Sequence, residues 1–138
     1  PTGDFEKVKR RLVDSLTANS FEHLIVALLQ LENPTEIWQQ TGGPGDGGID
    51  GLGCNEKGEV LGLVQCKLYA KSAPEVGNLG PDSRSIRRYA AVLVSKKEKD
   101  SNYSDSQTRL LDINWVAAKV IKHASRLPQA LSLRITPV

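Results

Sequence analysis

The sequence contains no methionine, only two cysteines and no long hydrophobic run. No apolar stretch approaches the ~20 residues that span a bilayer, and the first residues show no basic segment followed by an apolar one. We therefore expect no membrane partner and no export. Cys54 and Cys66 lack CxxC spacing and are too few for a zinc site or a disulfide framework, which fits a reduced, cytoplasmic setting. The missing methionine indicates a piece excised from a longer polypeptide.

The chain has 138 residues, enough for one hydrophobic core and too few for two full domains, so we expect residues 1–138 to form a single domain. The net charge is only +2 and does not by itself identify a nucleic-acid-binding protein. For each basic cluster taken alone, a solvated surface is the favoured interpretation. These clusters are Arg84, Arg87 and Arg88; Lys96, Lys97 and Lys99; and Lys119, Lys122 and Arg126.

Apolar residues at helical spacing predict an amphipathic helix over 4–16, and a second, largely buried helix capped by Ser20 that ends before Asn33 and Pro34. Short runs punctuated by glycine then predict strands joined by turns. The expected strands cover 36–41, 49–55 and 60–69, with a glycine-rich turn at 42–48 and a hairpin turn at Lys57-Gly58. We expect these three strands to form an antiparallel meander.

The second half of the chain predicts a buried strand, a short strand, a helix and a final strand. These elements are expected at 89–95, 108–112, 113–128 and 131–135, with a short helix near 83–88 and an exposed polar loop at 96–107. Together the elements predict an α/β fold in which helices flank a mixed sheet.

The hairpin between the second and third strands brings polar side chains together. A two-residue loop places Glu56 opposite Glu59 and Asp50 opposite Gln65, and Lys67 lies two positions from Gln65 on the same face. A four-residue loop preserves this result, whereas a three-residue loop breaks it unless a bulge compensates. Four apolar residues are expected on the opposite face, namely Ile49, Val64, Cys66 and Leu68. We interpret Cys66 as a small buried hydrophobe and not as a nucleophile.

These three polar residues suit phosphodiester hydrolysis, which needs a cation at the scissile phosphate and an activated water. Asp50 offers a hard oxygen ligand of the kind that Mg²⁺ prefers. Gln65 can add a neutral oxygen or orient a water, and Lys67 can stabilise developing charge or position the attacking water.

The stretch Gly42–Gly51, followed by Val64-Gln65-Cys66-Lys67, resembles the Mrr-type branch of the PD-(D/E)XK restriction endonuclease-like superfamily, as does Phe21-Glu22 on a helix. The resemblance implies a restriction endonuclease-like mixed β-sheet core flanked by helices. It also implies DNA cleavage that depends on Mg²⁺, or on Mn²⁺, in restriction or antiviral defence against foreign DNA.

By the same resemblance, Asp50 is the metal ligand, and Gln65 and Lys67 fill the last two positions of the motif. Glu22 is a helix carboxylate that approaches the site, and the carbonyl of Cys66 faces the metal. A homodimer and fused sensor or target-recognition domains are further expectations. Glu22 has an equally good alternative, in which the helix dipole favours a carboxylate in the first turns.

For other single residues, a structural or surface role is the favoured interpretation. Asp46 has a favoured structural role in its turn, and neither His23 nor His123 has metal-ligand spacing, so both are expected on a surface or a helix side. The glycine-rich turn lacks the Gly-Lys-Ser/Thr ending of a P-loop, and no Gly-x-Ser-x-Gly element supports a serine hydrolase.

Two other functions stay open beside a restriction-type endonuclease. One is a structure-selective nuclease such as a Holliday junction resolvase. The other is a non-catalytic nucleic-acid-binding domain with the same fold, because Gln65 replaces an acidic ligand and removes one negative charge from the metal site.

Overall fold

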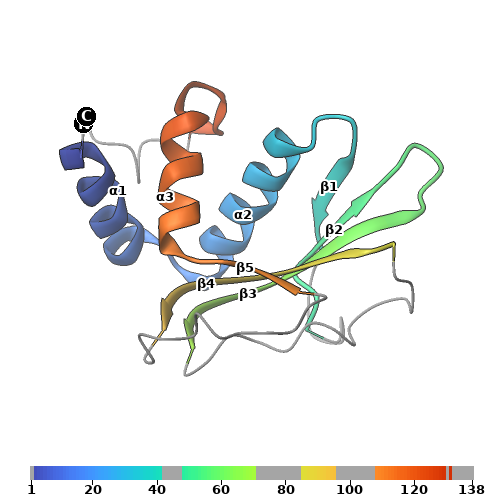
Figure 1. The fold of residues 1–138 in the computed structure, drawn as a ribbon, viewed down its shortest axis with the longest axis horizontal. Coiled ribbons are helices and arrows are strands. Elements are labelled where there is room, and N and C mark those ends of the chain that lie inside the picture. The colour runs from blue at the N-terminus through green and yellow to red at the C-terminus, as the bar shows by residue number, and fades with distance from the viewer. Residues whose placement is uncertain (1, 42–47, 71–84, 96–107, 130, 132–138) are drawn as a thin grey trace.

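A five-stranded sheet carries three helices on one of its faces in the computed structural model (Figure 1), which describes residues 2–41, 48–70, 85–95, 108–129 and 131. The helices are α1 (Thr2–Ser15), α2 (Ala18–Glu32) and α3 (Ile113–Lys122), followed by one 3-10 turn, η2 (Ala124–Arg126). The strands are β1 (Ile37–Gln40), β2 (Gly51–Cys54), β3 (Val60–Ala70), β4 (Arg87–Ser95) and β5 (Thr108–Leu111).

The sheet is mixed, as the sequence predicts. Its strand order is β1-β2-β3-β4-β5, with β1, β2 and β3 antiparallel and with β3, β4 and β5 parallel. The predicted meander is therefore confirmed. The apolar run that predicted a buried strand is β4, which pairs on both sides and is buried on both faces.

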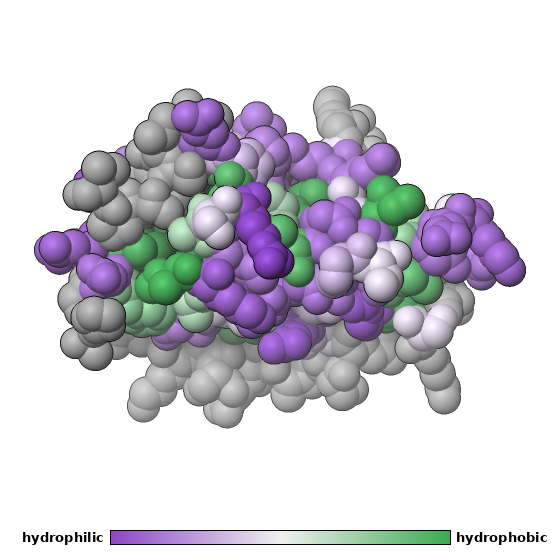
Figure 2. All heavy atoms as spheres, turned by 90° about the horizontal axis from the view of Figure 1, so that it is seen from above, coloured by the Kyte–Doolittle hydropathy of each residue, from purple (hydrophilic) through white to green (hydrophobic). Residues whose placement is uncertain are grey.

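The main core lies between the helices and the sheet. The apolar stripe of α1, with Val8 and Leu12, is buried there together with Leu16 just after the helix, as is the stripe of α2 around Phe21. A smaller core on the other face of the sheet contains Leu63, Ile86 and Ala90. On the helical side of the molecule, hydrophilic side chains separate the hydrophobic areas (Figure 2). Within the described residues, no helix has the length and apolar character that crossing a membrane requires.

The cap of α2 differs from the prediction. Thr17, not Ser20, is the N-cap residue, and Ser20 completes a capping box. The backbone N–H of Ser20 donates to Thr17 Oγ1 at 3.2 Å, while the backbone N–H of Thr17 donates to Ser20 Oγ at 2.8 Å. This reciprocal pair satisfies two backbone donors at the helix start and lets the helix begin one turn earlier.

The hairpin loop is also not the predicted one. The N–H of Asn55 bonds to the carbonyl of Glu59 and the N–H of Gly58 bonds to the carbonyl of Asn55, both at 3.0 Å, so the loop has three residues and Glu56 does not face Glu59. Gly58 closes it with a φ of 81°, a conformation that favours glycine. A bulge then shifts the register between Gly53 and Cys54, and this shift offsets the odd loop length.

Three predicted elements near the C-terminal half are wrong in part. Arg87 and Arg88 belong to β4 and not to a short helix at 83–88. The helix predicted to reach residue 128 ends at Lys122, because the turn at His123 tightens into η2 before Pro128. Leu131 is helical and not extended. The predicted turn at 42–47, the loop at 96–107 and residues 132–135 of the final strand lie outside the described residues.

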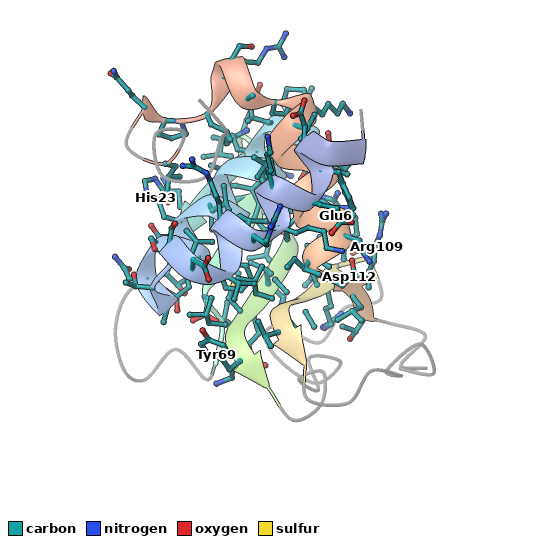
Figure 3. All side chains as sticks on the ribbon, turned by 90° about the vertical axis from the view of Figure 1, so that its left-hand side faces the viewer. Glu6, His23, Tyr69, Arg109 and Asp112 are labelled. Carbon is teal, nitrogen blue, oxygen red and sulfur yellow. The ribbon has the colours of Figure 1, made fainter. Side chains whose placement is uncertain are left out.

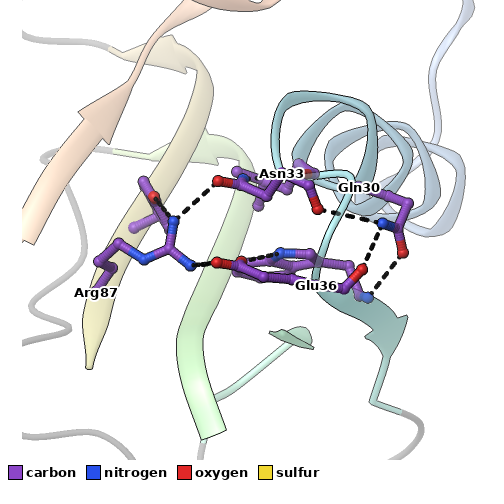
Figure 4. A network of polar contacts seen from close by, with 7 residues as sticks. Gln30, Asn33, Glu36 and Arg87 are labelled. Atoms are coloured by element: carbon purple, nitrogen blue, oxygen red, sulfur yellow. Dashed lines mark hydrogen bonds and ion pairs between the residues drawn. The ribbon is translucent and has the colours of Figure 1, made fainter. Parts of the chain in front are cut away.

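Two polar networks pair three of the basic residues, Arg87, Lys119 and Lys122, with carboxylates. Arg87 donates to Asn33 Oδ1 at 3.0 Å and pairs with Glu36, which also accepts from the indole of Trp38 at 3.0 Å (Figure 4). This network joins the end of α2 to the starts of β1 and β4. The arginine cluster that could have bound nucleic acid is thus partly used inside the fold.

The second network joins α2 to α3. Glu32 accepts from Lys119, from Lys122 at 2.9 Å and from His123 Nε2 at 2.7 Å. Burial by itself raises the pKa of Glu32, but these three hydrogen bonds outweigh it and lower the pKa to about 2. His123 is buried against this carboxylate, so its predicted surface position is wrong.

Candidate active site

Asp50 is held by both of the strands that flank it. Its N–H donates to the carbonyl of Val64 at 2.8 Å, and its carbonyl accepts from the N–H of Thr41 at 3.0 Å. The Thr41 hydroxyl also donates to the carbonyl of Ile49. The carboxylate Oδ2 of Asp50 accepts from the backbone N–H of Cys66 at 2.7 Å. Asp50 is therefore fixed through its backbone and its side chain by contacts with β3 and with Thr41, which follows β1.

The predicted register holds from Gly51 to Gly53 and is lost at Asp50. Gly51 pairs with Val64 and Leu52 pairs with Leu63, but the N–H of Asp50 also bonds to Val64, so the predicted pair of Asp50 with Gln65 is not formed. The predicted face of Ile49 is wrong, because Ile49 packs with Leu63 in the smaller core. The reason is that the N–H of Asp50 bonds to Val64, which already faces Gly51, so the alternation of side chains is interrupted at Asp50.

The backbone of Cys66 lies on the open edge of β3, where β2 has already ended. In an extended strand the N–H and the carbonyl of one residue point to the same side. Because the N–H of Cys66 meets Asp50, its carbonyl faces the same edge. The Cys66 thiol itself is buried in the main core, and burial first, then the charges of Asp50 and Glu22, raise its pKa. A neutral thiol fits the prediction of a buried hydrophobe.

Glu22 reaches Asp50 from α2, the helix that covers this part of the sheet. Burial raises the pKa of Glu22, and the charge of Asp50 and a side-chain hydrogen bond to it raise the pKa further, whereas the charge of Lys67 lowers it. The two carboxyl groups thus meet, with the Lys67 ammonium in their electrostatic neighbourhood. The structure brings together Glu22, Asp50, the Cys66 backbone and the charge of Lys67.

Gln65 and Lys67 emerge from the other side of β3. Val64, Cys66 and Leu68 pack on the helical side, so the residues between them point away from it. Lys67 is exposed, and among the described residues no carboxylate forms an ion pair with it. Gln65 is partly exposed, and its amide makes no hydrogen bond within the described part of the chain. Both side chains keep their polar groups for a ligand. Asp50 does not extend straight into this face, because its carboxylate turns to the strand edge.

The donor set fits a hard divalent cation. Two carboxylates that meet repel each other when both are ionised, and a cation between them removes that repulsion. Glu22 and Asp50 offer carboxylate oxygens, and the Cys66 backbone offers a carbonyl, whereas no contact among the described residues brings the Gln65 side chain to this pair. Mg²⁺ is commonly held by one or two carboxylates together with waters and substrate phosphates. In the described residues no group of three or more acidic, histidine or cysteine side chains adds further ligands.

We expect Glu22→Gln to stabilise the metal-free protein near neutral pH. The folded-state pKa of Glu22 is raised, so its favourable contribution is complete below its unfolded pKa of about 4.3 and is lost as the pH rises through the folded value. The glutamine variant escapes this loss. Because Glu22 is partly exposed, solvent screening limits the gain to about 1 kcal/mol or less.

Thermal melts of both proteins with EDTA, from pH 4 to pH 8, measure this difference. The melting temperatures should agree at pH 4 and diverge toward pH 8, with the variant higher. A variant that is less stable at pH 8 than the parent would mean that Glu22 has a favourable partner and not a repelling one. Added Mg²⁺ should then stabilise the parent more than the variant.

The mixed five-stranded sheet flanked by helices is an α/β fold of the restriction endonuclease-like class. The family model Mrr_cat, described as restriction endonuclease, matches residues 13–101. This match covers more than half of the chain, and the chain belongs to that family. No curated protein and no solved structure matches it.

Sequence reasoning missed Thr41, which holds the backbone around Asp50 through its N–H and its hydroxyl. No local sequence pattern indicates this contact. A glycine-rich segment separates Thr41 from Ile49 and Asp50, and its length does not specify which residues pair. Asp46, predicted to have a structural role in that turn, lies outside the described residues. His23 is exposed on α2, as predicted.

Proposed function

We propose that this chain is a DNA endonuclease domain that depends on Mg²⁺ or Mn²⁺ and hydrolyses phosphodiester bonds. The observation that carries the proposal is the carboxyl pair Glu22–Asp50, fixed to the backbone of Cys66 beside Lys67, in a chain of a restriction endonuclease family. This arrangement combines oxygen ligands for a cation with a positive charge for a phosphate.

Each residue has a defined task in this proposal. Asp50 and Glu22 hold the cation, with the Cys66 carbonyl and the Gln65 amide oxygen as further donors. The bound cation supplies a Lewis acid at the phosphate and lowers the pKa of a bound water. Lys67 donates to a phosphate oxygen as negative charge develops on it. Gln65 also orients the attacking water by a hydrogen bond.

The biological setting is part of the same proposal. The domain acts in the cytoplasm against foreign DNA, within a longer protein whose other domains sense or select the target. Cutting both strands of a duplex often involves two active sites, so we propose that the domain cuts as a homodimer.

A cleavage assay tests the activity. Supercoiled plasmid and linear duplex DNA are incubated with the protein and Mg²⁺, Mn²⁺ or EDTA, and the products are separated on gels. We expect nicked and linear products with Mg²⁺ or Mn²⁺ and none with EDTA. Cleavage that continues in EDTA, or no cleavage with any divalent cation, would contradict the proposal. A branched duplex, run beside the linear one, identifies a structure-selective nuclease if it alone is cut.

A second candidate is a nucleic-acid-binding domain without catalysis. The observation that favours it is that Glu22 and Asp50 are the only carboxylates brought together at this place among the described residues. Titration calorimetry separates the two functions. Binding of Mg²⁺ or Mn²⁺ supports the nuclease, whereas no metal binding, together with DNA affinity that falls steeply with salt, supports the binding domain.

A further inference from the structure

Tyr69 differs from the other described aromatic residues because its side chain is 62% exposed. Within the described part of the chain it makes no hydrogen bond and no ring contact. Exposure alone implies no function, because single apolar side chains are common on protein surfaces. The position of Tyr69 on β3 gives its exposure a meaning. The other described aromatic residues are buried or pack against the main core, namely Phe5, Phe21, Trp38, Tyr89 and Trp115.

Tyr69 lies on the same face of β3 as Lys67. Cys66 and Leu68 pack on the helical side, so the residues that alternate with them, Lys67 and Tyr69, point to the other face. The parallel register with β4 continues through both residues. Two residues of a strand span about 7 Å, which is about the length of two nucleotide steps along one DNA strand. A DNA strand whose phosphate meets Lys67 therefore brings a neighbouring nucleotide within reach of Tyr69.

This part of β3 also borders the acidic pair. The pairing of β2 with β3 ends at Val64, and the N–H of Cys66 beyond it bonds to the carboxylate of Asp50 and not to a strand. Tyr69 lies beside the C-terminal end of the same strand (Figure 3). The anchor of Asp50, the ammonium of Lys67 and the exposed ring thus follow one another along a short stretch of β3.

An exposed tyrosine ring offers a flat surface on which a nucleobase can stack. Stacking tolerates every sequence because each base has a π face, and a ring with two side-chain torsions loses little entropy when it binds. In a duplex, the faces of each base are covered by its neighbours. A protein ring therefore reaches a base face where the base leaves the stack, and this step costs least where the base is already unpaired.

We infer that Tyr69 stacks on an unpaired base next to the phosphate that Lys67 contacts, so that the site binds DNA with an unpaired base more tightly than fully paired DNA. The inference rests on the proposed function for its partner, DNA, and for the phosphate at Lys67. It defines the preferred substrate class as DNA with a bulge, a branch point or a single-stranded flank beside the phosphate that is cut.

Three fluorescent DNAs test this preference by anisotropy in EDTA, which prevents metal-dependent cleavage. The first is a fully paired duplex, and the second is the same duplex with one unpaired adenine. The third carries an abasic nucleotide in place of that adenine, so it keeps the bulged backbone but has no base to stack. This comparison needs no variant, and it tests the inference even if a substitution unfolds the protein.

Four variants assign the preference to the ring. Tyr69→Ala removes the side chain, Tyr69→Leu keeps apolar bulk without a ring, and Tyr69→Phe keeps the ring without the hydroxyl. The matched control is Ile37→Ala, which truncates an apolar side chain that is 50% exposed on the edge strand β1. Circular dichroism and thermal melts verify that each variant is folded.

We expect the parent to bind the adenine bulge roughly fivefold to a hundredfold more tightly than the paired duplex or the abasic bulge. Tyr69→Ala and Tyr69→Leu should bind all three DNAs alike, whereas Tyr69→Phe and Ile37→Ala should keep the preference of the parent. Equal binding of the three DNAs by the parent would overturn the inference, as would a parent that binds no DNA. A preference that survives in Tyr69→Leu, or that disappears in Tyr69→Phe, would also overturn it.

The same measurements separate this inference from the proposed function. If the preference for the adenine bulge depends on the ring of Tyr69 while the parent cleaves no DNA with any divalent cation, the stacking site is real and the nuclease proposal fails. If the parent cleaves DNA but binds the three DNAs alike, the nuclease proposal stands and the stacking site is wrong.

Discussion

Asp50→Asn is expected to reduce DNA cleavage by at least about 10²–10³-fold, since loss of a metal-binding charge costs several kcal/mol of transition-state stabilisation. The asparagine keeps an oxygen that can accept from the N–H of Cys66, so the local structure is retained. It also removes the charge that raises the pKa of Glu22, and the metal-free variant should melt no lower than the parent. Initial rates on plasmid DNA with Mg²⁺, together with a thermal melt, measure both effects.

A matched substitution identifies effects that any lost carboxylate would produce. Glu56→Gln makes the same chemical change, from a carboxylate to an amide, in the exposed hairpin loop. It should leave the cleavage rate within about twofold of the parent, because surface substitutions away from the site have small effects. Lys67→Ala should lose activity as Asp50→Asn does, because it removes the positive charge beside the carboxyl pair. If Asp50→Asn and Lys67→Ala both cut as fast as the parent, the assigned site is wrong.

Gly53→Ala is expected to destabilise the fold by about 3 kcal/mol or more, the upper range for overpacking. A Cβ at Gly53 would lie 2.2 Å from Cε2 and 2.6 Å from Nε1 of Trp38. The indole cannot move aside freely, because it donates to Glu36 and packs edge-on against Tyr89. Urea unfolding followed by circular dichroism gives the free energy of unfolding of both proteins.

Gly58→Ala is the matched control for the loss of a glycine. A Cβ at Gly58 meets no atom within 4 Å, but its φ of 81° is unfavourable for alanine and should cost about 1 kcal/mol. The two variants therefore separate overpacking from backbone conformation. If Gly53→Ala costs no more than Gly58→Ala, the packing of Trp38 on β2 adapts, and the close contact carries no stability.

Most elements could be predicted from the sequence because their patterns are local. The apolar spacing in α1 and α2 and the continuous apolar run in β4 each indicate an element without reference to the rest of the chain. The predicted register of β2 and β3 is confirmed from Gly51 to Gly53 for a less direct reason. The three-residue loop and the bulge after Gly53 offset each other, so the register matches that of a two-residue loop.

The candidate site was predictable in composition and not in geometry. Asp50, Gln65 and Lys67 could be selected because strand alternation and register relate them. The hydrogen bond from the Cys66 N–H to Asp50 could not be predicted, because it depends on a break in the alternation of side chains at Asp50. The approach of Glu22 depends on how α2 packs against the sheet, which no local pattern specifies.

By itself, the sequence determined the helices, the strands and which residue types could bind a cation and a phosphate, since hydrophobic periodicity and side-chain chemistry are properties of short segments. The tertiary structure alone decided which charged side chains form ion pairs and which do not. It paired Arg87 with Glu36, and Lys119 and Lys122 with Glu32, and it left Lys67 exposed and without an ion pair among the described residues. The physical reason is that Coulomb interactions depend on distances in space, and residues about 50 to 90 positions apart meet only when the chain has folded.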